Sequence, residues 1–341
     1  MDNDEKQVPA RNKGGRNLSE AFEIAVDHLL SHRNEFAREL LQSRSLRVSG
    51  TQETLRRRLI EAGAAGKLRL KDVVDHLNEI EGWGNQHIYA YKSDRRQLGH
   101  WRDQRKVVST LSGQGLADRL NSSRAIYLPR TPHLSTVLWS PDRVRFVWTV
   151  RRMWSERRPD KDQRNGSFEL RAFERRITRG TTAFDWDLNA GIALVMIQRL
   201  PSGTRYAQRR DAFIDTMRPL VDIDLFDPIL LSTAIVPLAE SGKLRERKIN
   251  LRSPAGGAVS FRSPSRQESV DDDPTLRNIA RQVRADTTGS LGNFFWLAHP
   301  DNPLESDLHF HIIDRDQRIA INGERRESEV RYVIGRILEL V

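Results

Sequence analysis

The strongest constraint on the fold is an alternation of apolar and basic residues near the middle of the chain. Apolar side chains stand at every second position there: Val144, Phe146, Trp148 and Val150. Arg143, Arg145 and Arg151 fall at positions of the opposite parity. A period of two is typical of a strand with one face on a core. The pattern therefore predicts a half-buried strand over residues 143–154, with arginines on the face away from the core.

A second arginine-rich segment, residues 168–177, predicts a neighbouring strand. Between residues 143 and 179 there are twelve cationic residues and five acidic ones, an excess of +7 in a chain whose net charge is +10. If the two strands pair, their arginines lie on one side of a sheet, where like charges are unfavourable unless a polyanion neutralises them. The charge pattern favours a track for nucleic acid. A solvated face with scattered ion pairs is the alternative.

The rest of the pattern predicts an α+β fold. Apolar residues recur at helical spacing from residue 18 to about 84, after which short strands and helices alternate irregularly. We expect a flexible tail over residues 1–17, a helical domain over 18–84 and a larger mixed-sheet domain over 85–341. Short strands are predicted at residues 87–91, 125–128 and 308–313. The apolar run at 191–200 fits either a buried strand or a helix.

The composition excludes several classes of protein. The chain has no cysteine, so it has no disulfides, thiolate metal sites or cysteine nucleophile. Its longest apolar run is far too short for a membrane helix, and its N-terminus lacks the apolar core of a signal peptide. We expect no membrane partner, no cofactor and no metal. The expected location is the cytoplasm or nucleoid, or the nucleus if the organism is eukaryotic.

Residues 36–60, FARELLQSRSLRVSGTQETLRRRLI, carry the most informative motif. The segment reads as a helix with paired leucines, a basic-Ser-Leu exit, a short loop ending in Ser49-Gly50-Thr51, and a second apolar helix. Gly50 permits a tight turn and Thr51 can cap the second helix. A helix N-terminus presents N–H groups and a positive dipole end, which suit a phosphate. Around the loop and the start of the second helix, five arginines and the single acid Glu53 give a local charge of +4; the arginines are Arg44, Arg47, Arg56, Arg57 and Arg58.

This segment resembles the SAP motif, a helix–loop–helix unit of chromatin-associated and DNA-repair proteins. The resemblance covers about 30 residues, and it departs from the family pattern at Gln52, where a basic residue is common. It implies duplex DNA binding with little sequence readout. A helical head followed by a basic mixed-sheet body is also loosely similar in architecture to centromere protein N. The candidate DNA-binding residues are Arg44, Arg47, Ser49, Gly50, Thr51, Arg56, Arg57, Arg143, Arg145, Arg151, Arg171 and Arg175.

Two patterns could indicate catalysis, and both are weak. Asp142 followed by Glu169-Leu170-Arg171 has the outline of a metal-dependent nuclease core, but arginine stands where such cores carry a lysine. His309 and His311 would share one face of a strand, a geometry that suits a metal, without a third ligand at a diagnostic spacing.

The sequence therefore predicts a DNA-binding protein that grips the phosphate backbone, with no catalytic residue assigned. Whether the chain is an enzyme stays open, and the pattern leans against it. The alternatives are a protein- or RNA-binding subunit of a defence or repair complex, and a degenerate metal-dependent nuclease. Double-stranded DNA is the partner that the charge pattern favours.

Overall fold

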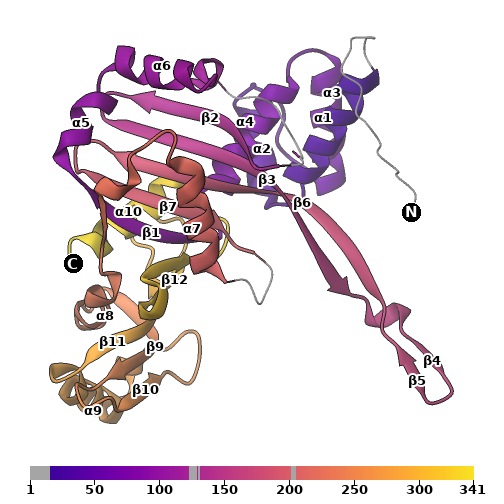
Figure 1. Ribbon diagram of the computed structural model, residues 1–341. Helices are drawn as coiled ribbons and strands as arrows, with labels where there is room; N and C mark the ends of the chain where they lie inside the picture. Colours follow the sequence, from indigo (N-terminus) through magenta and orange to yellow (C-terminus); the bar gives the residue numbers. More distant parts are fainter. Residues whose placement is uncertain (1–15, 123–128, 130, 201–204) are drawn as a thin grey trace. The chain divides into compact units, whose positions relative to one another are not determined.

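The computed structural model describes residues 16–122, 129, 131–200 and 205–341 (Figure 1). The fold belongs to the α+β class, as the sequence predicts. The chain divides into two compact units, which we call the head, up to Leu77, and the body, Asn78–Val341. Most of the expected tail over residues 1–17 and the expected strand at 125–128 lie outside the described residues.

The head is helical. It contains α1 (Arg16–Leu29), α2 (Asn34–Gln42), α3 (Gln52–Ala64) and the start of α4 (Leu70–Trp83). Leucines at helical spacing, including Leu29, Leu41, Leu55 and Leu59, are fully buried. The head therefore owes its core to the periodicity that predicts its helices.

The body is built on one large sheet whose paired strands are all antiparallel within the described residues. Its order is β10-β9-β11-β12-β13-β1-β7-β6-β3-β2, and β8 also pairs with β1. The strands are β1 (Gln86–Ser93), β2 (His133–Ser140), β3 (Arg143–Arg157), β6 (Phe173–Asp187), β7 (Ile192–Gln198), β8 (Phe226–Pro228), β9 (Leu244–Arg252), β10 (Ala258–Arg262), β11 (Thr288–Trp296), β12 (Leu308–Ile313) and β13 (Arg318–Ile321). The apolar run at 191–200 is thus a strand.

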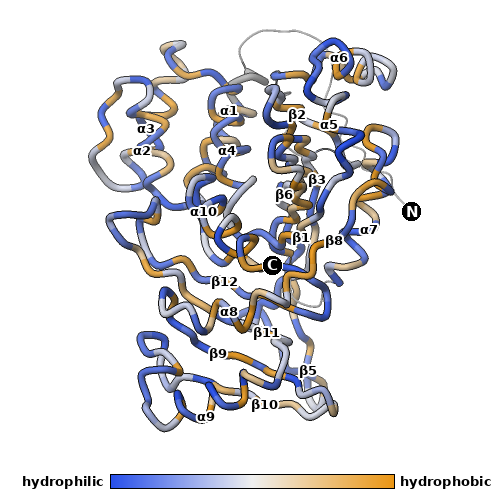
Figure 2. The backbone as a smooth tube through the Cα atoms, turned by 90° about the vertical axis from the view of Figure 1, so that its left-hand side faces the viewer, coloured by the Kyte–Doolittle hydropathy of each residue, from blue (hydrophilic) through white to orange (hydrophobic). Residues whose placement is uncertain are grey.

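Helices cover both faces of this sheet. They are α5 (Arg95–Trp101), α6 (Gln104–Gly113), α7 (Tyr206–Met217), α8 (Ile235–Glu240), α9 (Pro274–Ala285) and α10 (Glu327–Leu338), with short 3-10 turns between elements. Along β1, Ile88 and Ala90 enter one hydrophobic core while Tyr89 and Tyr91 enter another. Hydrophobic stretches accordingly gather along the central strands in Figure 2. A central strand of this body is buried on both faces.

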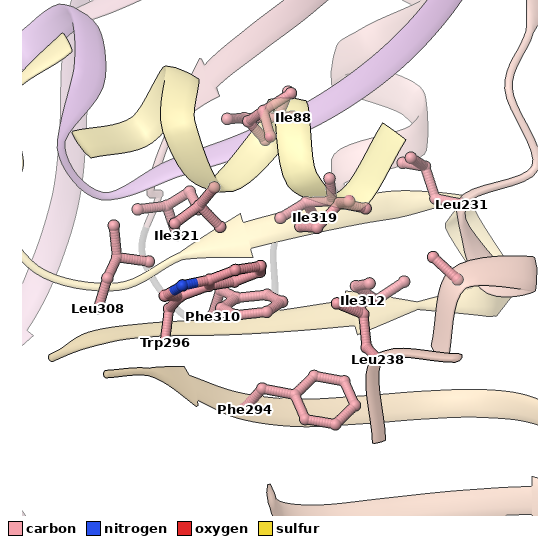
Figure 3. Close-up of a cluster of buried hydrophobic side chains, with 14 of the residues drawn as sticks. Ile88, Leu231, Leu238, Phe294, Trp296, Leu308, Phe310, Ile312, Ile319 and Ile321 are labelled. Atoms are coloured by element: carbon pink, nitrogen blue, oxygen red, sulfur yellow. The ribbon is translucent and has the colours of Figure 1, made fainter. Parts of the chain in front are cut away.

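The first core, which includes α8 and α10, contains the aromatic residues of the C-terminal strands. Figure 3 shows Phe294 and Trp296 of β11 beside Phe310 of β12, with Ile319 and Ile321 of β13 close by. The ring centroids of Phe294 and Phe310 are 5.6 Å apart. The second core lies on the other face and contains apolar residues of α5, α6 and α7.

Two strands extend beyond the rest of the sheet. The outer halves of β3 and β6 pair only with each other, and they end in a small hairpin of β4 (Gln163–Asn165) and β5 (Phe168–Leu170) (Figure 1). We call residues 151–179 the arm. The two arginine-rich segments of the sequence do pair, with Trp154 opposite Arg176 and Ser155 opposite Arg175. The expected strand over 168–177 is interrupted, since it contributes β5 and the start of β6.

Candidate nucleic-acid interface

The twelve cationic residues between 143 and 179 fall into three groups of four. Four are buried or partly buried in the body, four pair with the acids of the segment, and four are exposed with no carboxylate partner among the described residues. Only the last group can offer its full charge to a polyanion. The sequence counts all twelve alike, because it does not reveal which side chains the fold encloses.

Arg145 is buried and Arg143 is partly buried, so the prediction that both lie on a face of β3 away from the core is wrong. Arg145 is 3% exposed, its Nη2 donates to the carbonyl of Gly82 at 2.9 Å, and its guanidinium lies 3.9 Å from the ring centroid of Trp83. Burial lowers the pKa of Arg145 to about 10. The prediction fails because protein covers both faces of the inner half of β3.

Arg143 takes part in a compact cluster of charges around Trp83. Asp185 accepts from Arg143 Nε at 2.6 Å and from Arg331 Nη2 at 2.7 Å, and Glu327 also pairs with both arginines. Burial favours the neutral acid, but the two guanidinium groups hold the pKa of Glu327 below its usual value. Asp185 lies in β6, directly opposite Arg145 of β3.

Arg152 and Arg179 complete the buried or partly buried group. Arg152 donates to the carbonyl oxygens of Gln198 and Arg199, at 3.1 and 2.9 Å. A Cβ on Gly180 would meet the Arg152 guanidinium, so a glycine is needed on the facing strand. The Arg179 side chain is fully buried, with Glu81 at 3.4 Å. These contacts fix the base of the arm and leave neither cation free for a ligand.

All five acids of the arm pair with arginine. Asp162 pairs with Arg157, Asp160 with Arg158, Glu169 with Arg171, Glu156 with Arg176, and Glu174 with both Arg158 and Arg176. Arg171 is a candidate DNA-binding residue, and its Nη2 lies 3.4 Å from Glu169 Oε2 with much of its surface exposed. Exposed pairs of this kind contribute little to stability, but they cancel charge.

Four exposed cations of the arm have no carboxylate of the described residues within ion-pair distance: Arg151, Lys161, Arg164 and Arg175. Two of them, Arg151 and Arg175, are candidate DNA-binding residues. Both lie on the same face of the arm, because Arg151 and Ser155 share a parity on β3 and Arg175 stands opposite Ser155. Arg175 Nη2 donates to the sulfur of Met153 there, at 3.0 Å. The arm therefore carries a line of uncompensated positive charge.

The loop between α2 and α3 forms the second candidate surface, in the head. Ser45 has a φ of +56°, and Leu46 N donates to the carbonyl of Leu41 at 3.0 Å, which closes α2 with a Schellman-type exit. Gly50 has a φ of +123°, a region that side chains rarely adopt. Thr51 is the N-cap of α3, as the sequence predicts, and its Oγ1 accepts from Thr54 N at 3.4 Å.

The arginines around this loop differ in availability. Arg56 pairs with Asp27 of α1 at 2.6 Å, and Arg44 pairs with Asp72 of α4 at 2.9 Å. Arg58 donates to the loop carbonyls of Arg47 and Ser49 and so holds the loop in shape. Arg47 is exposed, with its Nε 3.1 Å from Ser49 Oγ.

Arg57 is also exposed and lies only loosely beside Glu61, at 3.8 Å. Gln52, the departure from the SAP pattern, donates to the carbonyl of Leu30 at 2.5 Å and so serves the head's own structure. Arg47 and Arg57 are thus the two loop cations that the fold leaves most available.

The structure does not bring the candidate nuclease carboxylates together. Asp142 precedes β3 and accepts from Asn189 Nδ2 at 2.9 Å, whereas Glu169 lies in the hairpin beyond the far end of that strand. A strand of 15 residues spans about 50 Å at the usual rise per residue. The two carboxylates therefore cannot share a metal ion within one chain.

His309 and His311 do share one face of β12, and their Nε2 atoms lie 3.1 Å apart. Asn293 Oδ1 lies 2.8 Å from His309 Nε2, and burial lowers the pKa of His309 to about 4. The histidine pair is thereby hydrogen-bonded to protein and uncharged at neutral pH.

A groove of about 580 Å³ lies between the base of the arm and α7. Trp148, Val150 and Phe213 give it an apolar lining. Three cations also line it: Arg151, Arg152 and Arg209. This composition suits a flat apolar group that carries or adjoins an anion.

Neither a protein-family model nor a curated protein sequence matches the chain. Among the described helices, none combines the length and the apolar character that crossing a membrane requires.

Proposed function

We propose that the protein binds duplex DNA through the phosphate backbone, with the unpaired cations of the arm and the α2–α3 loop of the head as its contacts. The observation that carries the proposal is the charge distribution of the arm. Five acids are each paired with an arginine, and four exposed cations have no carboxylate partner among the described residues, on a narrow projecting ribbon. A polyanion with regularly spaced charge complements such a line.

Arginine suits this role because its planar, forked donor matches phosphate oxygens. In the head, Arg47 and Arg57 stand near the N-terminal end of α3, where N–H groups and the helix dipole also favour an anion. The resemblance of this loop to the SAP motif supports the same reading. Contacts of this kind position a protein on DNA without reading its sequence. A protein with this function should be found where DNA is accessible, in the nucleoid or the nucleus.

The head's contribution is tested by removing two charges. The double variant Arg47→Gln/Arg57→Gln is expected to bind a duplex of about 30 base pairs about ten- to fiftyfold more weakly at about 100 mM salt, equally for unrelated sequences. The magnitude of the salt slope, log K against log salt, should decrease by about 2, because each phosphate contact contributes about 0.9. Fluorescence anisotropy measures both quantities.

The matched control is Lys243→Gln/Arg262→Gln, which removes the same charge from two exposed positions of the body outside both surfaces. This control should bind nearly as well as the unaltered chain. If the head variant and the control lose affinity equally, only net charge matters, and the loop is not a binding surface.

A further inference from the structure

The tip of the arm has a composition that phosphate binding does not explain. β4 and β5 are joined by Gly166 and Ser167, and Gly166 has the positive φ, +61°, that the first position of a type II′ turn requires. Gln163 stands opposite Leu170, and Asn165 stands opposite Phe168. Because directly opposed and alternate residues share a face, two amides and two large apolar side chains project together on one side of the tip.

The apolar pair is unusually open to solvent. Phe168 is 74% exposed, more than any other large hydrophobic side chain of the described residues, and Leu170 is 56% exposed. Farther down the arm, Phe173 and Met153 are also more than half exposed. Clustered apolar surface of this kind usually marks a contact site, since leaving it in water is unfavourable. These side chains lie on a projecting ribbon, where a partner can enclose them from both sides (Figure 1).

The neighbouring groups indicate what that partner is. An apolar protein surface would not need the amides of Gln163 and Asn165. Two exposed cations also lie at the tip: Lys161 precedes β4, and Arg164 projects from the other face, opposite Glu169. Cations, side-chain amides and apolar wedges are the combination with which proteins bind the minor groove: the cations meet phosphates, the amides meet base edges, and the wedges separate a base step. A two-stranded ribbon is narrow enough to follow a groove of duplex DNA.

We propose that the tip of the arm enters the minor groove of bound duplex DNA and that Phe168 inserts between two base pairs, so that the duplex kinks. This inference rests on the proposed function and goes beyond it, because phosphate contacts alone place no side chain between base pairs. Unstacking one base step is unfavourable, and the transfer of the Phe168 side chain from water into the stack offsets that cost. Flexible pyrimidine–purine steps should be preferred, because they open most easily.

The test measures binding and bending in the same titration. A duplex of about 30 base pairs carries a fluorescence donor and acceptor at its ends, and anisotropy reports binding. With the full chain, energy transfer should rise as the duplex is bound. The variant Phe168→Ser/Leu170→Ser should bind about tenfold more weakly and lose most of that rise. Its salt slope should be unchanged, because no cation is removed.

The control is Leu230→Ser/Val259→Ser, which replaces two exposed apolar residues of the body away from the arm and should bend the duplex as the unaltered chain does. Binding without a rise in energy transfer, or an equal rise with the tip variant, would overturn the insertion while leaving phosphate binding intact. Absence of binding at low salt would overturn both proposals. If the tip variant bends DNA normally but loses a self-association seen by light scattering, the tip packs on a second copy of the chain and the insertion is refuted.

Discussion

Removing the four unpaired charges of the arm is expected to weaken duplex DNA binding about 10²- to 10³-fold at about 100 mM salt. The variant is Arg151→Gln/Lys161→Gln/Arg164→Gln/Arg175→Gln. Each side chain is exposed and lacks a carboxylate partner, so the fold should be unaffected. The slope of log K against log salt should become shallower by about 3 to 4, because each lost phosphate contact reduces its magnitude by about 0.9.

A control variant with the same change in net charge shows whether the position of the removed cations matters. Lys92→Gln/Lys106→Gln/Lys243→Gln/Arg262→Gln removes four exposed cations elsewhere in the body. We expect this variant to bind within a few fold of the unaltered chain. Equal losses in both variants would show that the arm has no special role.

The second large effect concerns Trp83 and the stability of the body. Trp83 is 2% exposed, and the guanidinium groups of Arg145, Arg331 and Arg143 lie 3.9, 5.0 and 5.5 Å from its ring centroid. Trp83→Ala should lower the free energy of unfolding by about 3–5 kcal/mol, because it leaves a large cavity and removes the aromatic ring that the three guanidinium groups contact.

Urea unfolding followed by tryptophan fluorescence measures this loss in the body alone, because all seven tryptophans lie after residue 77. Trp83→Phe keeps a ring at the site and should cost less than half as much. A loss below about 1 kcal/mol for Trp83→Ala would contradict the role of Trp83 as a structural anchor.

The sequence predicts local structure well where the pattern is periodic. The alternation over 143–154 identifies β3, and the leucine spacing identifies the helices of the head. The alternation cannot show whether the second face of a strand is covered. Val147 and Thr149 share a parity with Arg145, and both are buried, so the inner half of β3 has no solvated face. That burial depends on elements distant in sequence, including α10.

The candidate site is predictable only in part, because the burial and pairing of its arginines also depend on residues distant in sequence. Charge counting finds the arm and the loop, and residue types identify Gly50 and Thr51 by their backbone roles. Charge counting cannot distinguish the unpaired Arg151 from the paired Arg143. Asp185, the partner of Arg143, lies 42 residues away in the sequence, and only the pairing of β3 with β6 brings the two side chains together. The exposed tip could have been noticed from Phe168 and Leu170 beside a glycine turn, but only the pairing of β4 with β5 places both on one face.

We propose that the unpaired cations of the arm, together with Arg47 and Arg57 of the head, bind the phosphates of duplex DNA. This proposal is tested most directly by measuring the affinity of the full chain for duplex DNA between about 50 and 200 mM salt. With four arm cations and two loop cations in contact with phosphates, log K should fall linearly with log salt with a slope of about −5. No binding at the lowest salt, or binding with a slope near zero, would contradict the proposal.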